Sequence, residues 1–192
     1  MKKFMNEKNY YLVGILLYSI FSISIFLGLL INEDASGRGT SNDFINTWEY
    51  VLLLQDNYFI DSSAWTRLFP IHYIFLSILY GLLGSEYSVR ILFCTLSILI
   101  PFIFYKNLRL KYKDTIKGKL LILASIILIL PYFRSSAIWP NPHISAMFFL
   151  LFSIYFFQKW HQDKIKQLNL NLILNIIFLA LTVYTRRYYV FF

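Results

Sequence analysis

The sequence predicts an all-α fold: a polytopic transmembrane helical bundle with interfacial helices in its first outer loop. Hydrophobic residues make up 58% of the 192 residues and aromatic residues 20%, a composition unlike that of ordinary soluble domains. Residues 10–31 carry no charge over 22 positions, enough to cross a hydrocarbon core of ~30 Å. Further uncharged runs cover residues 68–85, 91–105, 120–133, 135–158 and 167–185.

The basic residues predict which loops face the cytoplasm. All eleven lysines lie in three short clusters, at residues 2–8, 106–119 and 159–166. The positive-inside rule assigns such clusters to the cytoplasmic side. The segment 32–90 carries seven acidic residues against three arginines, a net charge of −4. We therefore expect this segment on the outer face, with the N-terminus inside.

One uncharged run has to remain outside the bilayer for this assignment to hold. If all six runs crossed, the second and third lysine clusters would lie outside. Residues 68–85 are the best candidate, because Pro70 interrupts the start of the run and Gly81 and Gly84 lie near its end. We predict that this segment is a helix on the outer interface.

The remaining elements follow in order. Phe44, Trp48, Val51 and Leu52 recur at helical spacing, which predicts an amphipathic helix over residues 43–55 with Ser41 or Asn42 as its N-cap. The first spanning helix covers residues 10–31. The expected later helices cover about 88–105, 119–133, 144–158 and 168–185, with a short outer loop over residues 134–143.

Residues 1–192 are predicted to form one transmembrane domain. The chain stops within an apolar run, so we expect the N-terminal part of a longer protein, apparently truncated. The bias towards Ile, Leu, Phe, Asn and Lys suggests an AT-rich genome and a bacterial inner membrane. The net charge of +8 follows the topology pattern, so no nucleic-acid partner is expected. The lone Cys94 lies in an apolar run and is expected to be a small core residue.

Motifs of soluble enzymes do not occur in the sequence. It has no phosphate-binding glycine loop, no zinc-ligand spacing and no nucleophile elbow. The polar residues predicted for the outer face remain as candidates for a site: Glu33, Asp34, Asp43, His72, Arg134, His143, Arg186 and Arg187.

Three features of the sequence, taken in order, resemble a known family. They are an acidic residue after the first helix, a Pro-x-His-Tyr segment at residues 70–73, and the run Ser-Glu-Tyr-Ser-Val-Arg at residues 85–90. This order is similar to the opening of GT-C type membrane glycosyltransferases, in particular protein O-mannosyltransferases and lipid A aminoarabinose transferases. The resemblance covers nearly the whole chain, which would be the N-terminal part of such an enzyme.

The resemblance implies transfer of a sugar from a polyprenyl-phosphate donor to a glycan, lipid or protein acceptor at the outer face. In enzymes of this family, a carboxylate in the first outer loop acts as general base on the acceptor hydroxyl. Asp34 occupies that place in this chain, with Glu33 as the alternative. A partly desolvated carboxylate would have a raised pKa suited to this role. The alternative is that Asp34 is simply a solvated residue after a helix.

The resemblance also suggests residues that bind the substrates. Arginine neutralises a phosphate with forked hydrogen bonds, so a donor phosphate would be bound by one or more of Arg134, Arg186 and Arg187. These arginines would otherwise contact ordinary lipid headgroups. Three further residues are candidate substrate contacts, namely Asp43, His72 and His143. Their alternatives are the first turn of an interfacial helix for Asp43, a structural hydrogen bond for His72 and a tight turn for His143.

No cofactor is predicted, and no metal ligand is assigned. A divalent metal is possible in principle, but the second outer loop lacks the acidic residue that related enzymes often carry there. Three rival functions remain: a flippase component for lipid-linked sugars, a lipid-linked glycan polymerase or ligase, and an inactive truncated fragment. A flippase would be expected to place charged residues within its spans, and these runs contain no Asp, Glu, Lys or Arg.

Overall fold

The computed structural model describes residues 6–56, 71–163 and 168–186, and every regular element in these ranges is helical. This part of the all-α prediction is confirmed. The elements are α1 (Glu7–Leu30), α2 (Gly39–Asp56), α4 (Ile71–Leu83), α5 (Glu86–Lys111), α6 (Lys117–Ser125), the 3-10 helix η1 (Ile126–Ile129), α7 (Pro131–Ile138), α8 (Pro142–Gln162) and α9 (Leu170–Thr185).

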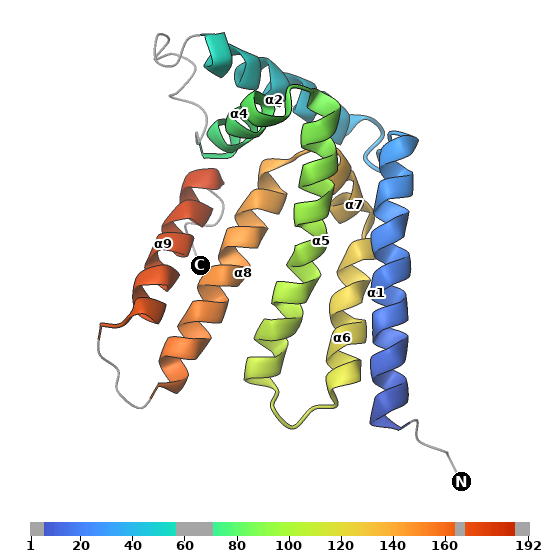
Figure 1. Cartoon of the computed structure of the whole chain (residues 1–192), viewed down its shortest axis with the longest axis vertical. Coiled ribbons are helices and arrows are strands. Elements are labelled where there is room, and N and C mark those ends of the chain that lie inside the picture. Colours follow the sequence, from blue (N-terminus) through green and yellow to red (C-terminus); the bar gives the residue numbers. More distant parts are fainter. Residues whose placement is uncertain (1–5, 57–70, 164–167, 187–192) are drawn as a thin grey trace.

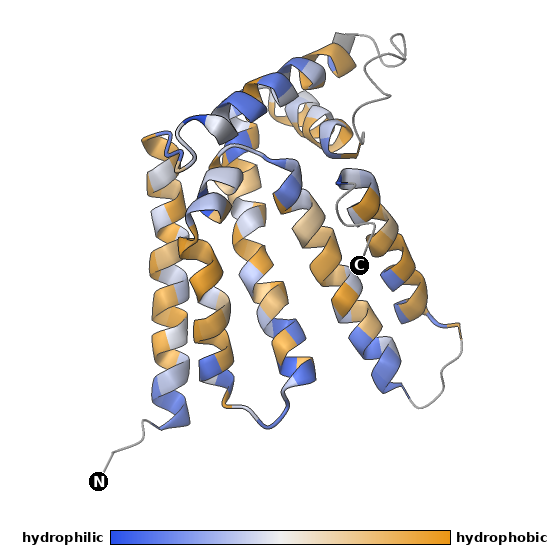
Figure 2. Ribbon diagram, turned by 180° about the vertical axis from the view of Figure 1, so that it is seen from behind, coloured by the Kyte–Doolittle hydropathy of each residue, from blue (hydrophilic) through white to orange (hydrophobic). Residues whose placement is uncertain are grey.

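One group of helices runs side by side, and another lies across one end of that group (Figure 1). The side-by-side helices are α1, α5, α6, α8 and α9, and the crossing helices are α2 and α4. We call the end with α2 and α4 the acidic end, because Glu33, Asp34 and Asp43 lie there. At the opposite, lysine end, α1 begins, α5 turns into α6 and α8 ends. Hydrophilic residues gather at both ends and hydrophobic residues between them (Figure 2).

Two helices are long and apolar enough to cross a membrane. They are α1 and α5, and a third span is added if α6, η1 and α7 are counted together as one bent helix. These helices meet the requirements of length and composition for a membrane span, among the residues that the structure describes. Helices α4 and α9 are apolar but shorter.

The predicted helix over residues 119–133 is wrong in one respect, because the chain breaks before its end. The helices Lys117–Ile129 and Pro131–Ile138 are bent by 65° relative to each other. Pro131 explains the break: its ring disfavours helical backbone at Leu130, which is extended, and it suits the first position of the next helix. The predicted outer loop over residues 134–143 is wrong for the same reason, since α7 continues through Arg134 to Ile138.

The other expected helices are found with shifted ends. Helix α5 is 26 residues long and begins two residues earlier than expected, because the Ser85 side chain accepts a hydrogen bond from the Ser88 amide at 3.1 Å. Helix α2 begins at Gly39, before the predicted Ser41 or Asn42 cap. Its predicted apolar face is confirmed in part, since Phe44 and Val51 are buried whereas Leu52 is 39% exposed. Cys94 is also fully buried, as expected for a small core residue.

Glycine allows α1 to pack closely against α6. A Cβ atom on Gly118 would lie 2.4 Å from the backbone carbon of Tyr10, and one on Gly14 would lie 3.0 Å from Leu121. A larger residue at Gly118 would therefore force the two helices apart. This contact fixes α6, and with it the start of α7, beside α1.

Candidate functional site

The acidic end brings the candidate residues together in two groups. Glu33 and Asp34 lie in the connection from α1 to α2, next to Arg134 of α7. His72 of α4, His143 of α8 and Arg186 after α9 form the second group. Arg187 lies outside the described residues.

Glu33 and Arg134 form an ion pair joined by two hydrogen bonds. Arg134 Nε donates to Glu33 Oε1 at 2.8 Å, and Arg134 Nη2 donates to Glu33 Oε2. The same guanidinium donates to the Ser24 hydroxyl at 2.6 Å and to the Ser24 carbonyl at 3.0 Å. The hydrogen bond and the charge of Arg134 lower the pKa of Glu33, although burial opposes the change. Glu33 is thus an ionised residue that fixes α7 to the end of α1.

The chain around this pair is shaped to accommodate it. A Cβ atom on Gly28 would lie 2.4 Å from Glu33 Oε2 and 2.8 Å from a methyl carbon of Ile138. Asn32 has a positive φ of 52° and reverses the chain after α1. The Glu33 amide then bonds back to the Gly28 carbonyl at 2.9 Å. Glycine at position 28 therefore gives the ion pair its space.

Asp34 caps the start of α2 from outside the helix. Its Oδ1 accepts from the Ser36 amide at 2.9 Å and from the Ser36 hydroxyl, and its Oδ2 accepts from the Ser41 amide at 2.8 Å. The Ser36 hydroxyl accepts in turn from the Thr40 amide at 2.7 Å. These bonds satisfy amides of the first turn, which have no partner within the helix.

The expected rise in the pKa of Asp34 is not found. Partial burial raises the pKa, but the hydrogen bonds from Ser36 and Ser41 outweigh burial and lower it. Asp34 is therefore ionised at neutral pH. It can accept a proton, but as a weaker base than expected from the sequence.

Arg90 is a buried cation that was not singled out as a candidate. It is 6% exposed, and its guanidinium lies 3.7 Å from the centre of the Trp139 ring. Its Nε donates to the Ile138 carbonyl at 3.0 Å and its Nη2 to Asn32 Oδ1 at 2.9 Å. Trp139 Nε1 donates to the Glu33 carbonyl at 3.1 Å. Arg90, at the start of α5, is thus bonded to Asn32, the residue before Glu33, and Trp139 is bonded to Glu33 itself.

His72 is fully buried, and both ring nitrogens have partners within the protein. Nδ1 lies 2.9 Å from the Ser145 hydroxyl and Nε2 lies 3.3 Å from the Pro140 carbonyl. Because a carbonyl only accepts, Nε2 carries the proton and Nδ1 accepts from Ser145. Burial lowers the pKa of His72 to about 3, so the ring is neutral. In this structure His72 supports the turn at Pro140 and has no exposed surface for a substrate.

His143 and Arg186 bring two of the candidate substrate contacts together. Arg186 Nη2 lies 2.9 Å from His143 Nε2, which joins the end of α9 to the start of α8. His143 also has its amide bonded to Asn141 Oδ1 at 3.0 Å, the N-cap of α8. Asp43 is exposed on α2 and lies within electrostatic range of Tyr73 and His143. This group thus places one cation and one carboxylate near the junction of α2, α4 and α8.

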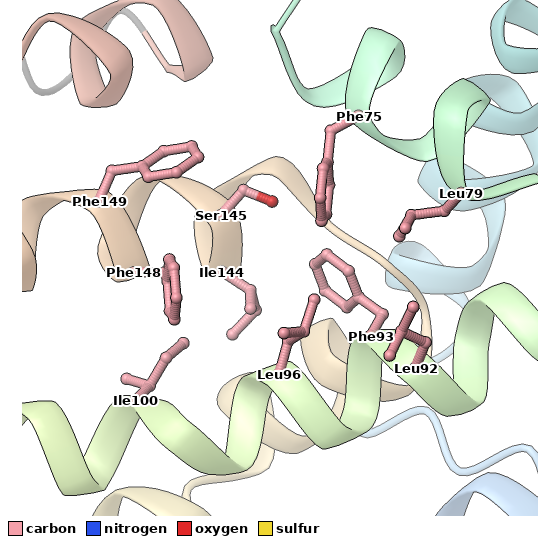
Figure 3. A pocket seen from close by; sticks show the side chains of 10 residues that line it. All are labelled: Phe75, Leu79, Leu92, Phe93, Leu96, Ile100, Ile144, Ser145, Phe148 and Phe149. Atoms are coloured by element: carbon pink, nitrogen blue, oxygen red, sulfur yellow. The ribbon is translucent and has the colours of Figure 1, made fainter. Parts of the chain in front are cut away.

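A pocket of about 330 Å³ lies between α4, α5 and α8 (Figure 3). All its lining side chains are apolar except Ser145, whose hydroxyl already contacts His72. Phe93, Phe148 and Phe149 are among the rings that project into it (Figure 3). The pocket suits a hydrocarbon group and offers no polar atom that would recognise a sugar.

Among the described residues, no three His, Cys, Asp or Glu side chains are grouped to bind a metal ion. The acidic end also carries an ionised carboxylate at Asp34 and a guanidinium at Arg186. Arg134 is already paired with Glu33.

Comparison with protein-family models, with curated proteins and with solved structures finds no match to this chain.

Proposed function

We propose that this chain belongs to a GT-C type glycosyltransferase in a bacterial inner membrane, which transfers a sugar from a polyprenyl-phosphate donor. The proposed membrane arrangement has α1, α5, α6–α7, α8 and α9 crossing the bilayer. Helices α2 and α4 lie on its outer surface. The acidic end faces outwards and the lysine end faces the cytoplasm, as the positive-inside rule favours.

One observation carries this proposal: the acidic connection after α1 and the lysine-rich turn from α5 to α6 lie at opposite ends of the helices (Figures 1 and 2). A carboxylate at the outer end of an apolar bundle is suitably placed to meet a substrate anchored in lipid. The lysine end also has a carboxylate, Asp114, in its connecting turn, but five basic residues lie within five positions of it in the sequence: Arg109, Lys111, Lys113, Lys117 and Lys119.

Asp34 is the proposed general base. As the acceptor hydroxyl attacks the anomeric carbon, its proton passes to Asp34, the bond from that carbon to the donor phosphate oxygen breaks, and polyprenyl phosphate leaves. Because Asp34 stays ionised at neutral pH, it is ready to accept the proton, and its bonds to Ser36 and Ser41 hold it in position. Glu33 serves as a positioning residue through Arg134.

Arg186 is the proposed contact for the donor phosphate. A guanidinium matches phosphate oxygens in charge and geometry. Arg134 is less suited than the sequence suggests, because Glu33 and Ser24 already occupy its donors. Arg187 remains a candidate from the sequence alone.

The test compares Asp34→Asn with Ser36→Ala. The second variant disturbs the same cap but keeps the carboxylate, so it is the matched control for damage to α2. Each protein is reconstituted in phosphatidylglycerol–phosphatidylethanolamine vesicles with synthetic polyprenyl-phosphate sugars, and both donor binding and release of polyprenyl phosphate are measured. We expect Asp34→Asn to lower release by about 100-fold or more with donor binding retained, and Ser36→Ala to lower it by less than about tenfold.

Two outcomes would contradict the proposal. Wild-type turnover by Asp34→Asn would remove the base role from this residue. Absence of release from every donor by the wild-type protein would remove the proposed transfer activity itself.

A further inference from the structure

The pocket between α4, α5 and α8 can be reached from the molecular surface. Of its lining side chains, Phe75, Leu92, Leu96, Phe148 and Phe149 are only half-buried. The neighbouring surface is also apolar, with Ile78 on α4 52% exposed. An occupant entering here would therefore pass from one apolar environment into another.

The lining excludes a polar occupant. Its one polar side chain, Ser145, donates its hydroxyl proton to His72. A sugar or nucleotide in the pocket would lose its hydrogen bonds to water without gaining replacements, which costs several kcal/mol. A hydrocarbon chain would lose none.

A positive charge lies beside the part of α8 that lines the pocket. Ile144 and Ser145 line it, and His143, the residue before them, contacts Arg186 at 2.9 Å. Arg186 also acts electrostatically on His72, the partner of Ser145. An apolar pocket with a guanidinium near one end matches an amphiphile that has a hydrocarbon chain and an anionic head.

We propose that this pocket binds one acyl chain of an anionic phospholipid, with the headgroup phosphate at Arg186 and His143. The volume of about 330 Å³ is at the small end of the range for ligand sites and suits part of a single chain. This inference rests on the membrane arrangement in the proposed function but not on sugar transfer. The bound lipid would fill the space between α4 and the spanning helices.

The experiment uses phosphatidylglycerol with a photoactivatable diazirine in its acyl chain, in vesicles that contain the whole protein. Cross-linked residues are identified by mass spectrometry. Leu96→Trp fills the pocket, and Leu99→Trp makes the same change three residues away on the exposed face of α5. We expect labels on Phe148 and Phe149 in the wild-type protein, a loss of about fivefold or more in Leu96→Trp and little change in Leu99→Trp.

A second variant tests the headgroup without changing the pocket. Arg186→Gln should remove the preference for phosphatidylglycerol over phosphatidylcholine, which we expect to be about fivefold for one basic residue. This arm remains informative if Leu96→Trp does not fold.

Two outcomes would overturn the assignment. Labels confined to exposed side chains such as Leu99, equal in both tryptophan variants, would show that the pocket stays empty. Displacement of the pocket label by polyprenyl phosphate but not by excess unlabelled phosphatidylglycerol would assign the pocket to the donor lipid. Because labelling requires no turnover, either result can be separated from failure of the transfer assay.

Discussion

Replacing Gly28 with alanine tests whether the Glu33–Arg134 pair organises the acidic end. The added Cβ would lie 2.4 Å from Glu33 Oε2, 2.8 Å from an Ile138 methyl carbon and 3.1 Å from Arg134 Nη2. These contacts are too close to be tolerated without movement. Because Glu33 and Arg134 are bonded to each other, both side chains would have to shift together.

The expected change in the free energy of unfolding has one stabilising and two destabilising contributions. Alanine gains about 1 kcal/mol over glycine in a helix. Overpacking costs about 1–3 kcal/mol. Disturbing hydrogen bonds between charged groups costs about 1.5–3 kcal/mol, reduced here because Glu33 is 26% exposed. We expect a net loss of about 2 kcal/mol, or about 4–8 °C in the melting temperature of a chain of this size.

The assay is thermal unfolding in detergent micelles, followed by circular dichroism. Gly81→Ala is the matched control, because a Cβ atom there would meet only Gln55 at 3.6 Å, and it should be neutral or slightly stabilising. Combining Gly28→Ala with Glu33→Ala should show strong non-additivity, because the second change removes the nearest clash. Gly28→Ala with wild-type stability, or simple additivity in the double variant, would show that the Glu33–Arg134 pair does not organise the acidic end.

Three further predictions concern the neighbouring groups. Arg90→Lys should lower stability by about 1.5–3 kcal/mol, because lysine cannot both stack on Trp139 and bond to Ile138, whereas Arg38→Lys on the exposed turn should change it by less than about 0.5 kcal/mol. Between pH 6.5 and 4.5 the unfolded chain protonates His72 while the folded chain does not. The free energy of unfolding should therefore decrease as the pH is lowered over this range, by up to about 1.4 kcal/mol per pH unit. His72→Gln should remove that part of the slope, and an unchanged slope would show that His72 is not held neutral. Because the pKa of Asp34 is lowered in the folded chain, its ionised form stabilises the fold at pH values above the ordinary pKa of 3.8. In the wild type this contribution to the free energy of unfolding should be lost as the pH falls below 3.8, and in Asp34→Asn it should be absent at every pH.

The positions of most helices could be predicted from the sequence, but the contacts between the helices could not. Residues 10–31 and 168–185 were found by their uncharged length, and α2 by the spacing of its apolar residues, because each pattern is local. The break before Pro131 also had a local signal, since proline disfavours helix at the preceding residue and is common at the first position of the next helix. The charge-free run around it masked that signal.

The site partners could not be read from the sequence. Glu33 and Arg134 are 101 positions apart, and His72 and Ser145 are 73 apart. No short-range pattern selects Glu33 rather than Asp34 as the partner of an arginine. The role of Asp34 as a cap likewise depends on the turn through Ser36, which brings its carboxylate to the amide of Ser41. These roles follow from tertiary packing.

The most direct test of the account is the side of the membrane on which each end lies. Single cysteines at the exposed positions Asn42, Tyr87 and Thr115 are introduced into a Cys94→Ala background and treated in intact cells with a membrane-impermeant maleimide. We expect that Asn42→Cys and Tyr87→Cys, which flank α4, both react, and that Thr115→Cys reacts only after the cells are permeabilised. Labelling of Asn42→Cys and Tyr87→Cys from opposite sides, or of Thr115→Cys in intact cells, would contradict it.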